Sequence, residues 1–443
     1  MKCDVAVVGG GPSGLSIARE LGKKNLDVIV VDRKAKVDDI SPGIMEMLSL
    51  QPNKIKVTDD KLIFTECGFE LDRRRAVKNE IFGFACYSPG LNRLAMVSKF
   101  PTNFAIDYKY WIKKLEEEAL ASGAKILHCT EAVGLIPAKE GFAGIRCADK
   151  KGMEFEINAG VTIGADGIRS KVARLAGFKK ERWGIHRIIG RRTKNFDPSL
   201  TEIGEGFNPQ HHNMYLGSRF VGPSTLGITA YLGKNEGYII NVVQTNTLPE
   251  APAVSPKDSL NKFISFLKNH PPCSRAYRKA SDGEPFAYLL PIDSPVPKPF
   301  EKKGIFLIGD AAFTIETQWT GAMAVAAKAA ECIKNVLDNE KNFQEYFSDY
   351  EEWWGRFVRN AKRQYDFTTL MHSFSDDELD EFIGFFSEDI TIDHLEGTDD
   401  EFGSPNEFII RVNKRLSEIN PDKVRSPKIK IVVTMIQKGV KQS

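Results

Sequence analysis

Residues 4–21 read DVAVVGGGPSGLSIAREL, an apolar run followed by a glycine-rich turn and then by a segment of helical composition. This is the order of strand, turn and helix that a dinucleotide-binding fingerprint requires. Gly9 permits the tight turn, Gly11 leaves room for a pyrophosphate, and Gly14 lets the helix pack closely on the strand. The phosphates then meet free N–H groups at the helix N-terminus. The stretch therefore predicts a Rossmann-like fold at the start of the chain.

A second apolar run, Val28 to Val31, ends in an acidic residue, Asp32. Asp32 follows the glycines at the distance where a carboxylate accepts hydrogen bonds from a ribose hydroxyl. NAD and FAD share the ADP moiety, so this unit alone does not choose between them. The predicted contacts of this first motif are Gly9, Gly11, Pro12, Ser13, Gly14 and Asp32.

A second motif lies far downstream and favours FAD. Gly304 to Ile308 is a short apolar strand that ends in Gly309 and Asp310, and an Ala-rich helix opens near Thr320. A carboxylate at the end of a strand can bind a ribityl hydroxyl, and a helix start offers backbone donors to the flavin ring. The predicted contacts of this motif are Gly309, Asp310, Gly321, Ala322 and Met323.

Between these two sites, residues 161–170 read VTIGADGIRS. This stretch, which contains Asp166, resembles the Asp-Gly motif of flavoprotein hydroxylases. The three motifs, in this order, resemble the glutathione-reductase-like flavoproteins that include aromatic hydroxylases and geranylgeranyl reductases. That resemblance implies bound FAD, contacted also by Asp166, and adenosine contacts at Arg33 and Val133.

The C-terminal third narrows the resemblance. Tyr350, Trp354 and Phe357, followed by residues 375–380 (SDDELD), resemble the helical tail of the geranylgeranyl reductase family. An aromatic stripe at helical spacing is equally typical of a core face. The chain departs from the family in residues 41–45 (SPGIM), which lack the cysteine of an Arg-Cys-Gly-type stretch, and in Tyr108, where many members carry an arginine.

Sequence patterns predict an α/β fold with three parts. A Rossmann-like FAD-binding domain of the flavoprotein hydroxylase type is assembled from separated segments. An antiparallel β-sheet substrate domain is expected where runs such as Gly227–Leu232 and Gly237–Val243 alternate in strand-like fashion. A helical region ends the chain. The predicted bounds are 1–60, 101–180 and 296–335 for the FAD domain, 61–100 and 181–295 for the substrate domain, and 336–443 for the helical C-terminal region.

Composition narrows the partners and the compartment. The formal net charge is +2, which gives no reason to expect nucleic acid. Seven scattered cysteines indicate reduced thiols, and neither they nor the histidines show the spacing of a metal site. With no signal peptide and no apolar run of spanning length, a cytoplasmic protein is expected. The basic groups 73–75 and 187–194 are typical of a solvated surface, with anionic lipid or a substrate phosphate as the alternative.

The leading functional hypothesis is reduction of carbon–carbon double bonds in an isoprenoid chain, as the resemblance to geranylgeranyl reductases implies. The partners would be an apolar small-molecule substrate, an external electron donor such as NAD(P)H or a ferredoxin-like protein, and a membrane surface. No catalytic residue is assigned, and Trp319 is a candidate wall of the substrate site, with core packing as the alternative. An FAD monooxygenase and an electron-transfer flavoprotein acting on quinone remain open, because one fold supports several reactions.

Overall fold

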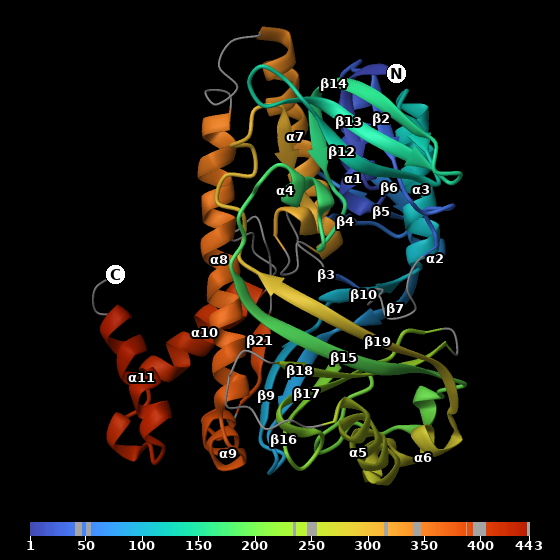
Figure 1. Ribbon diagram of the computed structural model, residues 1–443. Helices are drawn as coiled ribbons and strands as arrows, with labels where there is room; N and C mark the ends of the chain where they lie inside the picture. The colour runs from blue at the N-terminus through green and yellow to red at the C-terminus, as the bar shows by residue number, and fades with distance from the viewer. Residues whose placement is uncertain are drawn as a thin grey trace.

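The computed structural model describes residues 1–39, 47–49, 55–233, 236–245, 255–313, 318–339, 347–386, 388–392 and 405–440. Two layered units lie one above the other, and a long helix runs along both of them (Figure 1). The N-terminus belongs to the first unit. The last helices of the chain lie beside the second unit.

The first unit is built on a seven-stranded sheet whose central strands are parallel and buried on both faces. Its β1 pairs with β2 on one side and with β14 on the other. Runs such as Val28–Val31 suit a strand covered on both sides, since they carry no polar residue. The bounds are β1 Lys2–Val8, β2 Val28–Val31, β11 Lys125–Leu127, β12 Thr130–Pro137, β13 Phe142–Asp149, β14 Glu154–Gly164 and β20 Ile305–Leu307.

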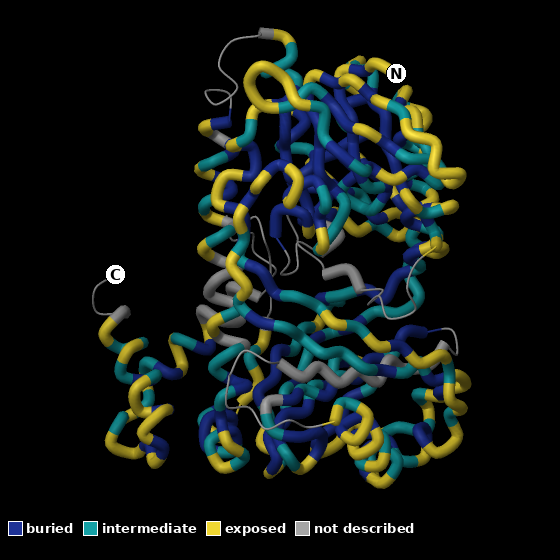
Figure 2. The backbone as a smooth tube through the Cα atoms, viewed as in Figure 1, coloured by how far each residue is buried: buried dark blue, intermediate teal, exposed yellow. Residues whose placement is uncertain are grey.

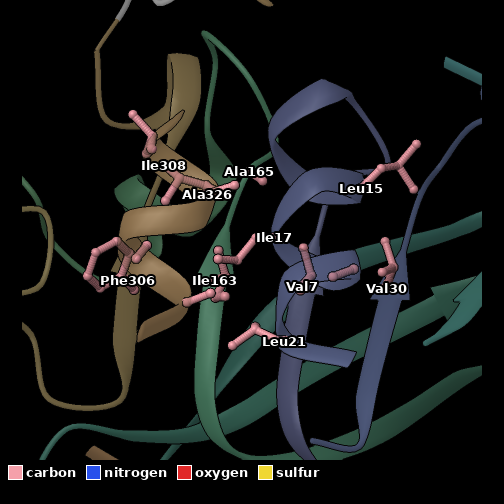
Figure 3. Close-up of a cluster of buried hydrophobic side chains, with 14 of the residues drawn as sticks. Val7, Leu15, Ile17, Leu21, Val30, Ile163, Ala165, Phe306, Ile308 and Ala326 are labelled. Atoms are coloured by element: carbon pink, nitrogen blue, oxygen red, sulfur yellow. The ribbon is translucent and has the colours of Figure 1, made fainter. Parts of the chain in front are cut away.

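Helices cover this sheet and bring distant parts of the chain together. Helix α1 (Pro12–Lys23) lies between α3 (Tyr108–Ala121) and α7 (Gln318–Asn339). In the core, Ile17 and Leu21 of α1 lie close to Ile163 of β14, and Ala326 of α7 comes in beside them (Figure 3). The alanines of α7 let this helix approach closely, so the last motif of the sequence packs against the first.

A small three-stranded sheet and one helical turn also pack into this first core. They contribute Leu62, Phe64, Phe69, Leu71 and Ala76. The boundaries predicted from the sequence assign residues 61–76 to the substrate domain, but the apolar faces of these strands are buried against the first unit. The bounds are β4 Ile55–Val57, β5 Lys61–Phe64, β6 Phe69–Asp72, α2 Arg73–Ala76 and, beyond Asp166, α4 Lys171–Leu175.

The second unit is an eight-stranded, mainly antiparallel sheet in the order β19-β15-β18-β17-β16-β8-β9-β21. This confirms the antiparallel sheet that the alternating sequence predicts, with β17 and β18 paired as neighbours. A smaller sheet, β3-β10-β7, lies between the units (Figure 1). The bounds are β3 Met47–Ser49, β7 Val77–Ile81, β8 Gly83–Tyr87, β9 Arg93–Ser98, β10 Asn103–Ile106, β15 Arg182–Lys194, β16 His212–Gly217, β17 Gly222–Ala230, β18 Glu236–Thr245, β19 Ser281–Asp293 and β21 Ile390–Ile392.

Helices cover one face of this sheet and connect it to the first unit. The outer face packs against α5 and α6, where Phe263 and Tyr277 are buried. Helix α8 begins in the first core with Tyr350 and Trp354 and ends in a third cluster that includes Met371. The bounds are α5 Pro256–Asn269, α6 Pro271–Lys279, α8 Ser348–Ser373, α9 Asp376–Gly384, α10 Pro405–Ser417 and α11 Pro427–Val440.

Specific hydrogen bonds hold α8 to both units. The Trp354 indole donates a 2.7 Å bond to the backbone oxygen of Val296. Farther along the helix, the Tyr365 hydroxyl donates to the backbone oxygen of Trp183 at 2.8 Å. Ser375 then caps α9 in a capping box with Glu378. The helical C-terminal region expected from the sequence is therefore present, and its first helix joins the two units.

Candidate functional site

The first motif, including Asp32, and the Asp-Gly motif meet at one edge of the first sheet. Strands β1, β2 and β14 are parallel, so their carboxyl ends lie together, and β1 is the point where the chain passes from one side of the sheet to the other. A cavity of about 400 Å³ opens there. Its lining consists of Val8, Gly9, Gly11, Val31, Asp32, Arg33, Lys34, Thr130, Glu131, Ala132, Ala165, Asp166, Gly167, Arg169, Lys171 and Arg174.

The glycines of the first turn have distinct geometric roles. Gly9 has a φ of +108°, and a Cβ there would lie 2.3 Å from the backbone oxygen of Ala165. A Cβ on Gly14 would lie 1.8 Å from the backbone oxygen of Gly9, so only glycine allows α1 to start this close to β1. A Cβ on Gly11 would meet no atom within 4 Å, because Gly11 faces the cavity. Gly11 thus keeps space free for a ligand.

Asp32 is a buried carboxylate at the end of β2. Its Oδ2 accepts a hydrogen bond from the Gly10 N–H at 2.6 Å, and its Oδ1 accepts one from the Lys34 N–H at 2.8 Å. The residue is only 5% exposed, and it lines the cavity. These backbone bonds fix the carboxylate where further oxygen lone pairs face the cavity, as acceptance of ribose hydroxyls requires.

Asp166 lines the same cavity, and its carboxylate also accepts hydrogen bonds from the start of α4. Its Oδ1 accepts from the Ser170 hydroxyl at 2.5 Å, and its Oδ2 accepts from the backbone N–H of Lys171 at 2.6 Å. Asp166 therefore holds the N-terminus of α4 in place, where a negative charge is favoured. Lys171 extends across the cavity wall to Glu131, with which it forms an ion pair.

The downstream motif reaches the first one through Ser13. Gly309 has a φ of +56°, and a Cβ there would lie 2.2 Å from the Ser13 hydroxyl oxygen. The next residue, Asp310, is exposed by its accessible area, although many protein atoms surround its carboxylate. These atoms partly desolvate the carboxylate and raise the pKa of Asp310 to about 6, and the nearby Lys180 ammonium opposes the rise.

Lys180 is a residue of this region that the motifs do not identify. Its Nζ donates to the backbone oxygen of Asp310 at 3.4 Å. Burial lowers the pKa of Lys180, while the charges of Asp293, Asp310 and Asp166 oppose that change. It precedes β15, about 130 residues before Asp310, so only tertiary structure reveals the pairing.

Helix α7 starts at Gln318, so Gly321 lies in its first turn. Ala322 and Met323 follow it and are buried at 3% and 2% exposure. This agrees with the helix expected to open near Thr320. The side chain of Trp319 and residues 41–45 lie outside the described residues, as does the side chain of Phe357.

The residues in and around the cavity differ in places from those that the motifs predict. Ala132 lines the cavity in β12, whereas Val133, the residue expected from the resemblance, is its neighbour and is absent from the lining. Tyr108 begins α3 and is 4% exposed. Burial raises the pKa of Tyr108 and the Asp32 charge adds to this, so its phenol stays neutral near the Asp32 carboxylate. The family pattern, which has an arginine at this position, does not indicate a buried tyrosine beside Asp32.

Comparisons with known proteins identify the cofactor class. Residues 2–214 match the family model described as an FAD binding domain. The chain is an FAD-dependent oxidoreductase. FAD is its cofactor. Flavin-dependent proteins of known structure share its fold.

Relatives extend the similarity over most of the flavoprotein. A digeranylgeranylglycerophospholipid reductase of Methanothrix thermoacetophila is 23% identical over 407 residues, covering 90% of this chain and 95% of that protein. A geranylgeranyl bacteriochlorophyll reductase-like structure from Thermoplasma acidophilum has a TM-score of 0.74 at 21% identity, covering 98% and 99% of the two chains. A flavin-dependent brominase has a TM-score of 0.63 at 17% identity, covering 94% and 99%. The fold is thus a mixed α/β fold of the flavoprotein hydroxylase type.

Cysteines, metal-ligating side chains, long helices and basic groups were also located in the structure. All seven cysteines are free thiols, and five of them are buried. Among the residues that the structure describes, no cluster of His, Cys, Asp or Glu could hold a metal ion. In the same residues, no helix combines the length and the apolar character needed to cross a bilayer. Of the basic groups noted in the sequence, Arg73 pairs with Glu80, Arg74 with Asp60, and Arg191 with Asp282.

Proposed function

We propose that the cavity at β1, β2 and β14 holds the ADP half of FAD. The fit rests on Gly11, whose missing side chain leaves the cavity open, and on the preorganised Asp32 carboxylate. Gly9, Pro12, Ser13 and Gly14 would present backbone N–H groups to the pyrophosphate at the start of α1. Arg33, which lines the cavity, would contact the adenosine, and Val133, the neighbour of the lining residue Ala132, would do so from the edge of the cavity. Asp166 would contribute by holding the α4 end of the cavity in place.

We propose that the flavin half of FAD lies on the other side of Ser13 from this cavity. Asp310 would accept a hydrogen bond from a ribityl hydroxyl, and Gly309 would let the strand end approach Ser13. Gly321, Ala322 and Met323 would bring the N-terminus of α7 to the ring, where its N–H groups stabilise negative charge. When bound, FAD supplies a two-electron hydride centre.

We infer that the reaction is saturation of carbon–carbon double bonds in an isoprenoid chain. The observation that carries this inference is the similarity to digeranylgeranylglycerophospholipid reductases over 90% of the chain. The resemblance of the helical tail, with Tyr350 and Trp354 on α8, supports it. The resemblance of the tail also supports the proposal that this chain belongs to the glutathione-reductase-like flavoproteins. The electron donor would be external, either NAD(P)H or a ferredoxin-like protein.

A sheet face of the second unit offers a suitable substrate wall. Residues that lie opposite each other on paired strands point to the same face of the sheet. The strand register therefore places five apolar side chains on one face, namely Ile188, Tyr288, Leu226, Ile228 and Met214. All five side chains are only partly buried. Their strand neighbours on the opposite face, such as Tyr215 and Thr229, are fully buried. Leu226 packs against the cluster that contains Met371 of α8, and the face as a whole is apolar and only partly buried.

This apolar face points toward the first unit. Ile188 and Tyr288 pack against Ile81 of β7 and Ala105 of β10, strands of the sheet between the units. The opposite face is covered by α5, since a Cβ on Gly227 would lie 2.9 Å from the Phe263 ring. We propose that the isoprenoid lies along the inner face, between the two units. There, apolar side chains exclude water and hold an alkene, which has no polar group to anchor it.

Domain bounds follow as part of this proposal. The FAD domain would comprise the segments 1–60, 101–180 and 296–335, and the substrate domain 61–100 and 181–295, with the 61–76 strands packed against the FAD domain. Residues 336–443 would form the helical C-terminal region. Trp319, at the start of α7, would contribute to the wall near the substrate.

One experiment tests the function. The purified protein, loaded with FAD, is titrated with NADH, NADPH and reduced ferredoxin while flavin absorbance and oxygen uptake are recorded, and geranylgeranyl lipid is then added. We expect flavin reduction by one donor and a product heavier by two hydrogens per reduced double bond. Stoichiometric oxygen uptake with a hydroxylated product would identify a monooxygenase instead. Electron transfer to quinone without a saturated lipid would identify an electron-transfer flavoprotein.

A further inference from the structure

The C-terminal helices form a basic arm that stands out from the body of the molecule. In Figure 1, α10 and α11 extend sideways from the second unit, beyond α8 and α9. Residues 405–443 contain nine Lys and Arg against three Asp and Glu, a net charge of +6. The whole chain carries only +2, so residues 1–404 carry a net charge of −4. The net positive charge of this protein therefore resides in its last 39 residues.

Helix α11 has two apolar faces, and only one of them is used in packing. Ile429 and Val433 are fully buried in the cluster that α11 shares with α8, α9 and α10. On another face, Ile431 is 60% exposed and Met435 is 67% exposed. They are four residues apart and therefore lie next to each other on the helix surface.

This pair has no counterpart in the described part of the chain. The other exposed large apolar side chains there lie singly on different elements or loops. Basic residues flank the pair on the same side of α11. Lys438 lies three residues after Met435, and Lys428 lies three residues before Ile431, where its ammonium also donates to the backbone oxygen of Ser373 and pairs with Glu378. Both lysines are exposed. Figure 2 shows much of the backbone of this arm in the colour of exposed residues. An exposed apolar strip bordered by lysines is the pattern of a helix that lies in a membrane interface.

We propose that the Ile431–Met435 face of α11 docks this protein peripherally on an anionic lipid surface. The two apolar side chains enter the boundary between head groups and acyl chains, and the basic arm is attracted to the negative head groups. The inference extends the proposed function, since a polyprenyl lipid substrate resides in such a membrane.

Charge argues for lipid over a second copy of the chain. A two-fold interface through the same face would place two arms of net charge +6 side by side. Like charges at short range oppose such contact, especially where apolar groups exclude water. An anionic bilayer provides the opposite charge over its whole surface.

The test is vesicle sedimentation of the full-length, FAD-loaded protein. Vesicles of phosphatidylcholine with about 30% phosphatidylglycerol are compared with phosphatidylcholine alone. We expect binding to the anionic vesicles that weakens as salt shortens the range of the charges. Joint substitution Ile431→Ser and Met435→Ser should weaken partitioning about tenfold, and Lys438→Glu should weaken it about fivefold or more.

A matched control removes apolar surface elsewhere. Met153 and Ile203 are 66% and 70% exposed, nearly the same as Met435 and Ile431. The double variant Met153→Ser and Ile203→Ser should bind the anionic vesicles as the wild type does. Circular dichroism and bound-FAD absorbance should be the same for all variants, which shows that each one is folded.

Two results would overturn the proposal. The first is equal vesicle binding by the wild type and the Ile431→Ser/Met435→Ser variant. The second is a wild-type dimer, measured by light scattering, that the α11 variant converts to monomer while neither protein binds vesicles. Reduction of a detergent-dispersed isoprenoid is measured in parallel. If vesicle binding occurs without reduction, the proposed function fails and the docking surface stands.

Discussion

The amino-acid sequence determines the FAD crevice, which is the cavity at β1, β2 and β14, and the apolar face of the second sheet in different ways. In the crevice, backbone geometry decides, because Gly9 and Gly14 each approach another backbone oxygen more closely than a side chain would allow. On the sheet face, Ile188, Ile228 and Met214 need only be apolar and point the same way. The first region admits one residue type at fixed spacing, and the second admits many. A cofactor shared by many proteins thus leaves a motif, whereas a site for an apolar chain leaves only a pattern of alternation.

The largest expected effect comes from the glycines of the crevice. Gly14→Ala places a Cβ 1.8 Å from the backbone oxygen of Gly9, so α1 must move and the crevice must distort. We expect a large loss of thermal stability and a protein purified without FAD. Gly11→Ala meets no atom within 4 Å. It should keep the melting temperature of the apoprotein but weaken FAD binding, because its methyl group fills the cavity.

Melting temperatures of both apoproteins and their FAD dissociation constants check this contrast. An apo Gly11→Ala variant as unstable as Gly14→Ala would mean that Gly11 serves packing, not the ligand. A Gly14→Ala variant with normal FAD content would contradict the close approach of α1 to β1.

The next effect concerns Asp32. In Asp32→Ala, the N–H groups of Gly10 and Lys34 lose their acceptor, and a ribose hydroxyl loses its partner. Leaving such groups buried and unpaired costs about 1–3 kcal/mol, or about 5- to 150-fold in FAD affinity. Isothermal titration of the apoprotein with FAD measures it. Asp32→Asn, which keeps one of the two oxygens, should fall between; unchanged affinity in both variants would show that Asp32 is not a ribose ligand.

A smaller effect is expected on the sheet face. Ile228→Ser removes apolar contact with the proposed substrate and should raise the KM for a geranylgeranyl lipid about tenfold. FAD affinity should stay as in the wild type, since Ile228 lies in the second unit. Steady-state kinetics and flavin titration separate the two. The surface variant Ile203→Ser is the control, and a normal KM in Ile228→Ser would remove this residue from the substrate wall.

The smallest effect is the pH dependence from Asp310. Its pKa rises from 3.8 to about 6 on folding, so the folded apoprotein binds more protons than the unfolded chain between these values. The contribution of this group therefore makes stability fall as the pH rises from about 4 to about 6. Urea unfolding at several pH values should show a flatter profile for Asp310→Asn. Parallel profiles for the two proteins would place the carboxylate in an ordinary solvated environment.

The elements near the motifs could be predicted from the sequence. Strand β2 covers Val28–Val31 as expected, and the downstream strand and the Ala-rich helix occur where the apolar runs place them. These elements follow from local pattern, because the glycines, the apolar runs and the acidic strand ends lie within short windows.

Contacts between distant segments could not be predicted. Lys180 reaches the backbone of Asp310, and Trp354 reaches that of Val296, although neither pair shares a local pattern. The strands that contain Leu62 and Leu71 pack into the first core because of tertiary burial that no local signal shows. Nor does the local sequence show that α8 joins the two units.

The path of the chain through the first unit also governs how the protein is made. Strand β1 ends at Val8, but β20, which extends the same sheet, begins only at Ile305, and α7 follows it. At about 5–20 residues per second, a ribosome needs roughly 15–60 seconds to synthesise the chain between them. During that time α1 has no α7 to pack on. The nascent N-terminal segment therefore exposes apolar surface that chaperones can recognise, and the proposed FAD site can be completed only after about three quarters of the chain has been made.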